Sequence, residues 1–130
     1  MRISPELYQE LIDHAQAEAP NECCGMIAAR EGEAVRVIRA RNAAESPLRY
    51  EIDGAEQLTI YNEIEDAGLD LGAIYHSHTR TEPYPSQTDI SLAFYPESLY
   101  VIVGVAGTEP EVRAFSIRDG QVGEAELQVG

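Results

Sequence analysis

Two histidines separated by a single residue, His76 and His78, end an apolar segment, and the carboxylate of Asp89 follows eleven residues after the second. In an extended segment, side chains two residues apart point to the same face, so both imidazoles can bind one metal ion. Asp89 adds a third, anionic ligand. Because three protein ligands leave the fourth position of a tetrahedral zinc ion to water, this pattern predicts a catalytic zinc site and not a structural one.

A zinc ion lowers the pKa of the water that it binds. Hydrolysis by this water also needs a general base, and Glu22 is the candidate. It lies between the first predicted helix and the first predicted strand, where a sheet edge can hold its carboxyl near the metal. We expect Glu22 to hydrogen bond to the water without ligating the metal. The hydroxyl of Ser86 is a candidate donor to the oxyanion that forms when a carbonyl is attacked.

Each of these signals also has an ordinary explanation. A His-x-His pair is commonly two unrelated side chains, and Glu22 taken alone is typical of a loop acid. Ser86 and Asp89 have the Ser-x-x-Asp spacing of a helix capping box. The capping and the metal interpretations are compatible, because a capped helix start would hold Asp89 rigidly for a metal. The combination of the signals in one chain favours the zinc site.

The chain has two cysteines, Cys23 and Cys24, and they are adjacent. Neighbouring cysteines pair only with backbone strain, so no disulfide is expected, and the count fits a reducing compartment. It also excludes a structural zinc site made of four cysteines. Cys24 is expected to be a small buried residue, whereas Cys23 adjoins Glu22 and can border the cleft. His14 is expected on the surface of the first helix, without a role.

The periodicity of apolar residues predicts the elements that position these groups. Ser4 can cap a first helix that begins at Pro5 and ends before Pro20, and Asp53 can cap a second helix that Gly68 ends. The other predicted elements are a hairpin over 24–40, strands at 48–52, 71–77, 99–105, 112–118 and 121–129, a loop over 79–88, and a short helix from Ser86 to about Tyr95.

This order of elements predicts an α/β protein in which a mixed, mostly antiparallel sheet is packed with two to three helices. The length predicts one domain, residues 1–130, with enough chain to bury a hydrophobic core. The run 99–105 is expected to be a central strand buried on both faces. The histidine pair emerges from the end of a strand of that sheet, where clefts tend to form.

The composition limits the partners. The net charge is −14, from 23 acidic and 9 basic residues, which disfavours binding to nucleic acids and to anionic membranes. The acidity serves either solubility or the attraction of a basic partner protein, and both explanations stay open. No apolar run reaches the roughly 18–20 residues of a membrane span, and the first residues lack the apolar core of a secretion signal. A cytoplasmic location is therefore expected.

The motif resembles the signature of the JAMM, or MPN+, zinc metalloproteases, in which a distant Glu precedes His-x-His, seven residues, Ser, two residues and Asp. The spacing agrees at every position, and the resemblance extends from the first helix to the 99–105 strand. It implies one zinc ion per chain, metal ligation by His76, His78 and Asp89, a general base at Glu22 and an oxyanion donor at Ser86. It also implies a fold similar to that of cytidine deaminases, an α-β-α arrangement.

Within that family the chain is similar to the bacterial branch and to the actinobacterial Mec peptidases. The segments that carry this likeness are 44–47 before Tyr50, 75–79, 81–82, 84–86 and 88–89. The likeness implies a substrate that is a ubiquitin-like sulfur carrier (CysO-, ThiS- or MoaD-like), with cysteine or a tail extension released beside its Gly-Gly end. Whether the protein forms a homodimer is left open.

One departure concerns Thr79, since many members of the family have Pro after the second histidine. Thr79 is not at a ligand position, so the departure bears on substrate preference. The chain is too short for the insertions with which deubiquitinating relatives hold ubiquitin. Two alternatives remain: a non-catalytic scaffold, against which the complete ligand set counts, and a nucleobase deaminase, whose His-x-Glu and Pro-Cys-x-x-Cys motifs are absent.

Overall fold

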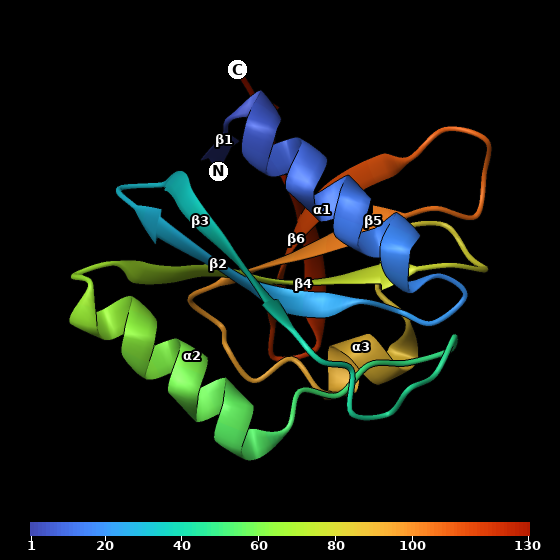
Figure 1. The fold of residues 1–130 in the computed structure, drawn as a ribbon, viewed down its shortest axis with the longest axis horizontal. Coiled ribbons are helices and arrows are strands. Elements are labelled where there is room, and N and C mark those ends of the chain that lie inside the picture. The colour runs from blue at the N-terminus through green and yellow to red at the C-terminus, as the bar shows by residue number, and fades with distance from the viewer.

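The computed structural model describes residues 1–130 and contains one eight-stranded sheet and three helices (Figure 1). The strands are β1 (Arg2–Ile3), β2 (Cys24–Arg30), β3 (Glu33–Ala40), β4 (Asp70–His78), β5 (Leu99–Gly104), β6 (Glu111–Arg118), β7 (Gln121–Ala125) and β8 (Gln128–Val129). The helices are α1 (Pro5–Glu18), α2 (Gly54–Asp66) and α3 (Gln87–Ser91). No helix has the length and apolar character needed to cross a bilayer.

The strand order is β7-β6-β5-β4-β2-β3-β1-β8. The pairs β2–β3, β2–β4, β5–β6 and β6–β7 are antiparallel, while β4–β5, β1–β3 and β1–β8 are parallel. Strands β7 and β8 follow each other closely in sequence but occupy opposite edges, so the sheet curls until its edges approach. The predicted mixed, mostly antiparallel sheet with helices is confirmed.

Helix α1 begins as the sequence predicts. The Ser4 hydroxyl accepts a hydrogen bond of 3.2 Å from the backbone N–H of Leu7, and proline occupies the first helical turn. The apolar side of the helix, with Leu11 and Ala15 fully buried, packs on one face of the sheet. In β4 the side chain of Tyr75 faces this layer.

The opposite face of the sheet carries α2 and the segment around α3 (Figure 1). Asp53 caps α2 by accepting from two backbone N–H groups, and Ile60 and Ile64 pack against the sheet. Ile74, which is next to Tyr75 in β4, points to this face. Because side chains alternate along a strand, His76 and His78 also belong to the α2 and α3 face.

The central strands are buried on both faces, as the apolar run 99–105 predicts. β5 has five buried residues out of six, and β2 six out of seven. Helices on each side of the sheet exclude solvent from both faces of these strands. This explains why the sequences of β2 and β5 are almost continuously apolar.

Three predicted elements differ in the structure. The predicted strand at 48–52 is wrong, because only an isolated bridge joins Asn42 and Ile52, and backbone groups of Arg49 and Glu51 bond to the Asn42 side chain instead of a neighbouring strand. Helix α3 ends at Ser91 and not near Tyr95. The predicted strand 121–129 divides into β7 and β8, and β8 pairs with β1, which at two residues is too short to leave a periodic pattern.

Candidate metal centre

Strand β4 brings the two histidines together. Their side chains lie two residues apart on the same face, and their Nε2 atoms are 3.2 Å from each other. Both residues are almost fully buried. β4 lies between β2 and β5, so the backbone that carries the pair is hydrogen bonded on both sides and the pair has little freedom to move.

Asp89 reaches the histidines from α3. Its Oδ2 atom lies 3.1 Å from Nε2 of His76 and 3.0 Å from Nε2 of His78. The Ser86 hydroxyl accepts from the backbone N–H of Asp89 at 3.1 Å, and Asp89 Oδ2 accepts from the backbone N–H of Ser86 at 2.9 Å. The predicted capping box is therefore confirmed, and the same contacts hold the Asp89 carboxylate toward the histidines.

His76, His78 and Asp89, the metal cluster below, could hold a metal ion, since one ligand atom from each lies within 4.8 Å of the others. His78 Nδ1 is 2.8 Å from the Glu82 carbonyl oxygen, which can only accept, so Nδ1 carries the hydrogen and Nε2 a lone pair. That lone pair faces the Asp89 carboxylate. Two such atoms repel at this distance unless a cation or a proton lies between them, so the donor set fits a cation.

Burial and hydrogen bonding shift the pKa of each member of the metal cluster. Burial alone would raise the pKa of Asp89, but hydrogen bonds with His76 and His78 outweigh it and hold that pKa far below its usual range. Burial lowers the pKa of His76, against the opposing effect of Asp89. Burial would also lower the pKa of His78, but its bonds with Asp89 and the Glu82 carbonyl raise it overall.

Tyr50 covers His76 from one side. The two rings are stacked, with centroids 4.4 Å apart and planes 22° apart. Nδ1 of His76 is buried and has no hydrogen-bond partner in the protein, so the orientation of this imidazole depends on packing against Tyr50 and on the cluster itself. Tyr50 has no function that the sequence predicts, and its one signal is its place beside the segments that carry the bacterial likeness.

Glu22 lies two residues before the start of β2 and is 4% exposed. Burial raises the pKa of its carboxyl to about 8, while His78 works to lower it and Asp89 to raise it further. Its Oε1 atom is buried without a hydrogen-bond partner. Glu22 is therefore not a solvated loop acid but a buried carboxyl within electrostatic reach of the metal cluster.

The neighbouring cysteines are buried free thiols. Burial raises the pKa of Cys23 to about 11 and that of Cys24 to about 12, so both thiols are protonated near neutral pH and neither is a nucleophile. The expectation of a small buried Cys24 is confirmed. The expectation for His14 is wrong: it is 3% exposed, and its Nδ1 lies 2.7 Å from the Tyr75 hydroxyl.

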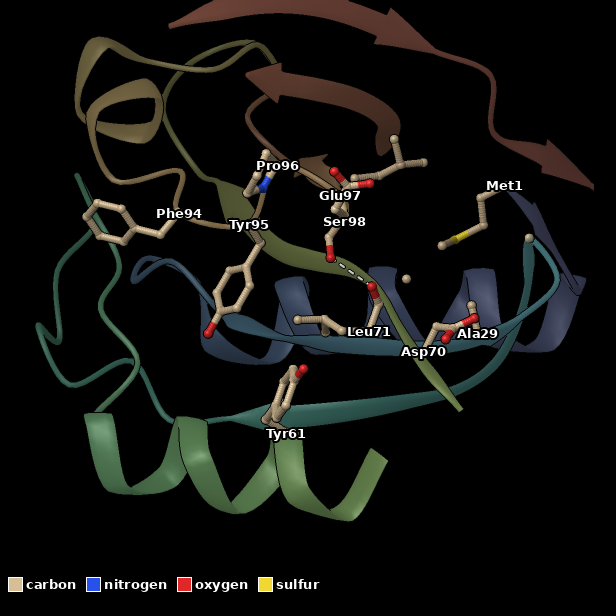
Figure 2. A pocket seen from close by; sticks show the side chains of 13 residues that line it. Met1, Ala29, Tyr61, Asp70, Leu71, Phe94, Tyr95, Pro96, Glu97 and Ser98 are labelled. Carbon is tan, nitrogen blue, oxygen red and sulfur yellow. Dashed lines mark hydrogen bonds between the residues drawn. The ribbon is translucent and has the colours of Figure 1, made fainter. Parts of the chain in front are cut away.

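Several cavities lie on the α2 and α3 face. A cavity of 580 Å³ runs between α2 and the segment 94–99, with Tyr61 and Tyr95 in its wall (Figure 2), and no member of the metal cluster lines it. A second, mainly apolar cavity of 400 Å³ is lined by Tyr50, Ile74 and Tyr100 among others. Because Tyr50 stacks on His76, this second cavity adjoins the metal cluster.

The curled sheet, its helices and this cluster define the JAB1/MPN class of fold. A JAB1/MPN domain protein from Archaeoglobus fulgidus has a similar structure, with a TM-score of 0.67 at 20% identity over 100% of this chain and 96% of that one. The family described as prokaryotic homologs of the JAB domain matches residues 4–118. The chain belongs to this family.

Similar proteins of named activity support the assignment to this family. The chain is 40% identical over 130 residues to the CysO-cysteine peptidase of Mycobacterium tuberculosis, covering 98% of this chain and 89% of that protein. It is 40% identical over 116 residues to a Thermus thermophilus protein named "Probable TtuB-protein conjugate cleaving protease", covering 88% and 74%. A Desulfitobacterium hafniense protein solved in solution has a TM-score of 0.89 at 30% identity, covering 99% and 92%. The predicted hydrolase class is confirmed by these relatives.

Proposed function

We propose that this protein is a zinc-dependent peptidase that cleaves at the C-terminal Gly-Gly tail of a ubiquitin-like sulfur-carrier protein, releasing cysteine or another group attached to the tail. The observation that carries the proposal is the meeting of His76 Nε2, His78 Nε2 and Asp89 Oδ2 at separations of 3.0–3.2 Å. The names of the relatives, which refer to CysO-cysteine and to TtuB conjugates, support the substrate class.

Zinc suits this donor set, because two imidazole nitrogens and one carboxylate oxygen are among its usual ligands and leave a position open. When bound, zinc supplies Lewis acidity, which lowers the pKa of a water at the open position toward about 7. His76, His78 and Asp89 would hold the ion, and the remaining steps belong to side chains around them.

Glu22 is proposed as the group that moves the proton. It accepts a proton from the attacking water and then gives it to the nitrogen that leaves when the amide bond breaks. Burial raises the pKa of this carboxyl and so strengthens it as a base, while the positive charge of a bound zinc ion would favour its ionised, proton-accepting form. Its burial also keeps bulk water from competing for the same proton.

Ser86 is proposed to stabilise the oxyanion. Its hydroxyl oxygen accepts a hydrogen bond from the backbone N–H of Asp89, which leaves its own hydrogen free to donate. A donor fixed in place before the reaction favours the negative charge that develops on the carbonyl oxygen of the substrate.

The burial of the metal cluster favours a slender substrate. His76, His78 and Asp89 are each at most 8% exposed, so bulky side chains next to the scissile bond would be excluded, whereas glycines let a backbone approach closely. The apolar cavity beside Tyr50 lies on the same face of the sheet and offers room for apolar side chains that precede the two glycines.

The test is mass spectrometry of a ubiquitin-like carrier charged with cysteine at its Gly-Gly end. We expect the zinc-loaded protein to return the carrier to the mass of its free tail, the chelator-treated protein to leave the adduct intact, and added zinc to restore cleavage. Cleavage that proceeds equally in the chelator would contradict a zinc mechanism. An adduct that survives the zinc-loaded protein would contradict the proposed substrate.

A further inference from the structure

A buried amide side chain, that of Asn42, bonds to two segments that border the metal cluster. Its Nδ2 donates to the backbone oxygens of Glu22 and Arg49, both at 3.0 Å. Its Oδ1 accepts from the backbone N–H groups of Ala44 and Glu51, also both at 3.0 Å. Both hydrogens of the amide are used and its oxygen accepts twice, so its hydrogen-bonding capacity is filled.

The segments that Asn42 joins carry Glu22 and Tyr50. Tyr50 lies between the two residues of its loop that bond to Asn42, and its ring stacks on His76 at 4.4 Å. Two backbone bonds run beside the amide, from Glu22 N–H to the Ser46 oxygen at 2.9 Å and from Ala43 N–H to the Glu51 oxygen at 2.7 Å. One side chain thus fixes the proposed base relative to the aromatic wall of the site.

Glu22 depends on such a bond because its carboxyl has no anchor of its own. Oε1 is buried without a partner, and the hydrogen bonds of this residue in the structure are those of its backbone N–H and oxygen. The position of the carboxyl therefore follows the position of the backbone. A small displacement of a catalytic group lowers the rate strongly, since proton transfer requires hydrogen-bond distance.

We propose that Asn42 is a positioning residue that sets the Glu22 carboxyl and the Tyr50 ring against the metal cluster, and so controls the rate of hydrolysis without touching the metal. The inference rests on the proposed function of Glu22. Asparagine is specific in this role, because an aspartate of the same shape would place a carboxylate oxygen, which can only accept, against the carbonyl oxygens of Glu22 and Arg49.

The test compares Asn42→Asp with the parent and with Asn62→Asp, which makes the same change at an exposed site on α2. All three are loaded with zinc and assayed on the cysteine-charged carrier at a temperature where circular dichroism shows each fully folded. For Asn42→Asp we expect zinc affinity within about threefold of the parent, kcat lower by at least about tenfold, and KM changed by less than about threefold. Asn62→Asp should match the parent in all three quantities.

Hydrogen exchange supplies a readout that needs no activity. The amides of Glu22 and Ala43, whose bonds to the Ser46 and Glu51 oxygens lie beside the lost Nδ2 contacts, should exchange faster in Asn42→Asp, while those of β5 stay protected. If Asn42→Asp does not fold, Asn42→Ser, which keeps a shorter donor and acceptor, is measured in its place with the same expectations.

A kcat within twofold of the parent, or a loss of zinc affinity that parallels the loss of kcat, would overturn the inference. So would unchanged exchange at both amides. A parent without activity would instead refute the proposed function, and the exchange result would still report on the contacts of Asn42.

Discussion

The hydroxyl of Ser77 accepts a hydrogen bond of 2.8 Å from the backbone N–H of Cys23, and the Ser77 N–H donates to the Cys23 oxygen at 3.1 Å. Ser77 is the residue between the two histidines, and Cys23 is the residue after Glu22. These two bonds therefore join the proposed base to the histidine pair across 54 positions of sequence. The proposed base and the histidine pair are therefore held together by bonds between neighbouring strands, and not by the loops alone.

Replacing the proposed base separates metal binding from catalysis. We expect Glu22→Gln to keep zinc with parental stoichiometry, since Glu22 is not among the proposed ligands, and to lower turnover by about 10²–10⁴-fold, the usual contribution of general acid–base catalysis. Glu18→Gln, at an exposed acid near the end of α1, is the control and should keep full activity. Turnover of Glu22→Gln within tenfold of the parent would end the general-base role.

Removal of Asp89, the proposed acidic ligand, should act on zinc binding itself. Asp89→Ala is expected to weaken zinc binding by more than about 100-fold, because the loss of a ligand has a larger effect than the 10–100-fold typical of residues behind the ligands. Competition with a chromophoric chelator measures the affinity. Asp53→Ala, which removes the capping carboxylate of α2, controls for a loss of helix capping. An unchanged zinc affinity in Asp89→Ala would refute the ligand role.

Ser86 has two tasks that can be measured apart. Ser86→Ala should lower kcat by about 10²–10³-fold through loss of the oxyanion donor, and should lower the free energy of unfolding by about 1 kcal/mol through loss of the α3 cap. Asp53→Ala should lose comparable stability and keep kcat. If both variants keep kcat when folded, Ser86 is only a cap.

His14 makes the stability depend on pH. Burial, and then the charge of Arg39, lower its pKa from 6.5 to about 4 in the folded protein. Between these values the unfolded chain binds more protons than the folded one, so the free energy of unfolding falls as pH falls from about 6.5 to 4. One pKa unit corresponds to about 1.4 kcal/mol, so the full loss is on the order of 3 kcal/mol.

Urea unfolding of the metal-free protein at about pH 7, 5.5 and 4.5 measures this loss. In His14→Gln the amide can still hydrogen bond to the Tyr75 hydroxyl but does not titrate, so the decline between these pH values should be shallower than in the parent. The metal cluster contributes equally to both proteins. Identical declines would show that His14 does not bear the linkage.

Much of the fold follows from local patterns that the sequence displays. The cap at Ser4, the apolar run of β5 and the capping box at Ser86 each depend on neighbours in sequence, and each is present in the structure. The metal cluster was also predictable, because two of its members share a strand face and the third is fixed by its own helix cap.

The predictions from sequence that were wrong involve long-range contacts. His14 has the spacing of a surface residue, but it is buried because Tyr75, 61 positions away, offers it a hydroxyl. The segment 48–52 has the composition of a strand, but Asn42 takes up its backbone groups. Ser77 carries no local signal of its role, since its partner is a backbone atom 54 positions away. Asn42 bonds locally to Ala44, but its bond to the Glu22 oxygen spans 20 positions and has no local signal.

The most direct test of the account is anomalous X-ray diffraction at the zinc edge on crystals of the zinc-loaded protein. We predict one strong anomalous peak bonded to Nε2 of His76, Nε2 of His78 and a carboxylate oxygen of Asp89, with the Glu22 carboxyl facing the open side of the ion but not bonded to it. A peak elsewhere, or no peak at these three residues, would contradict the assignment of a zinc hydrolase.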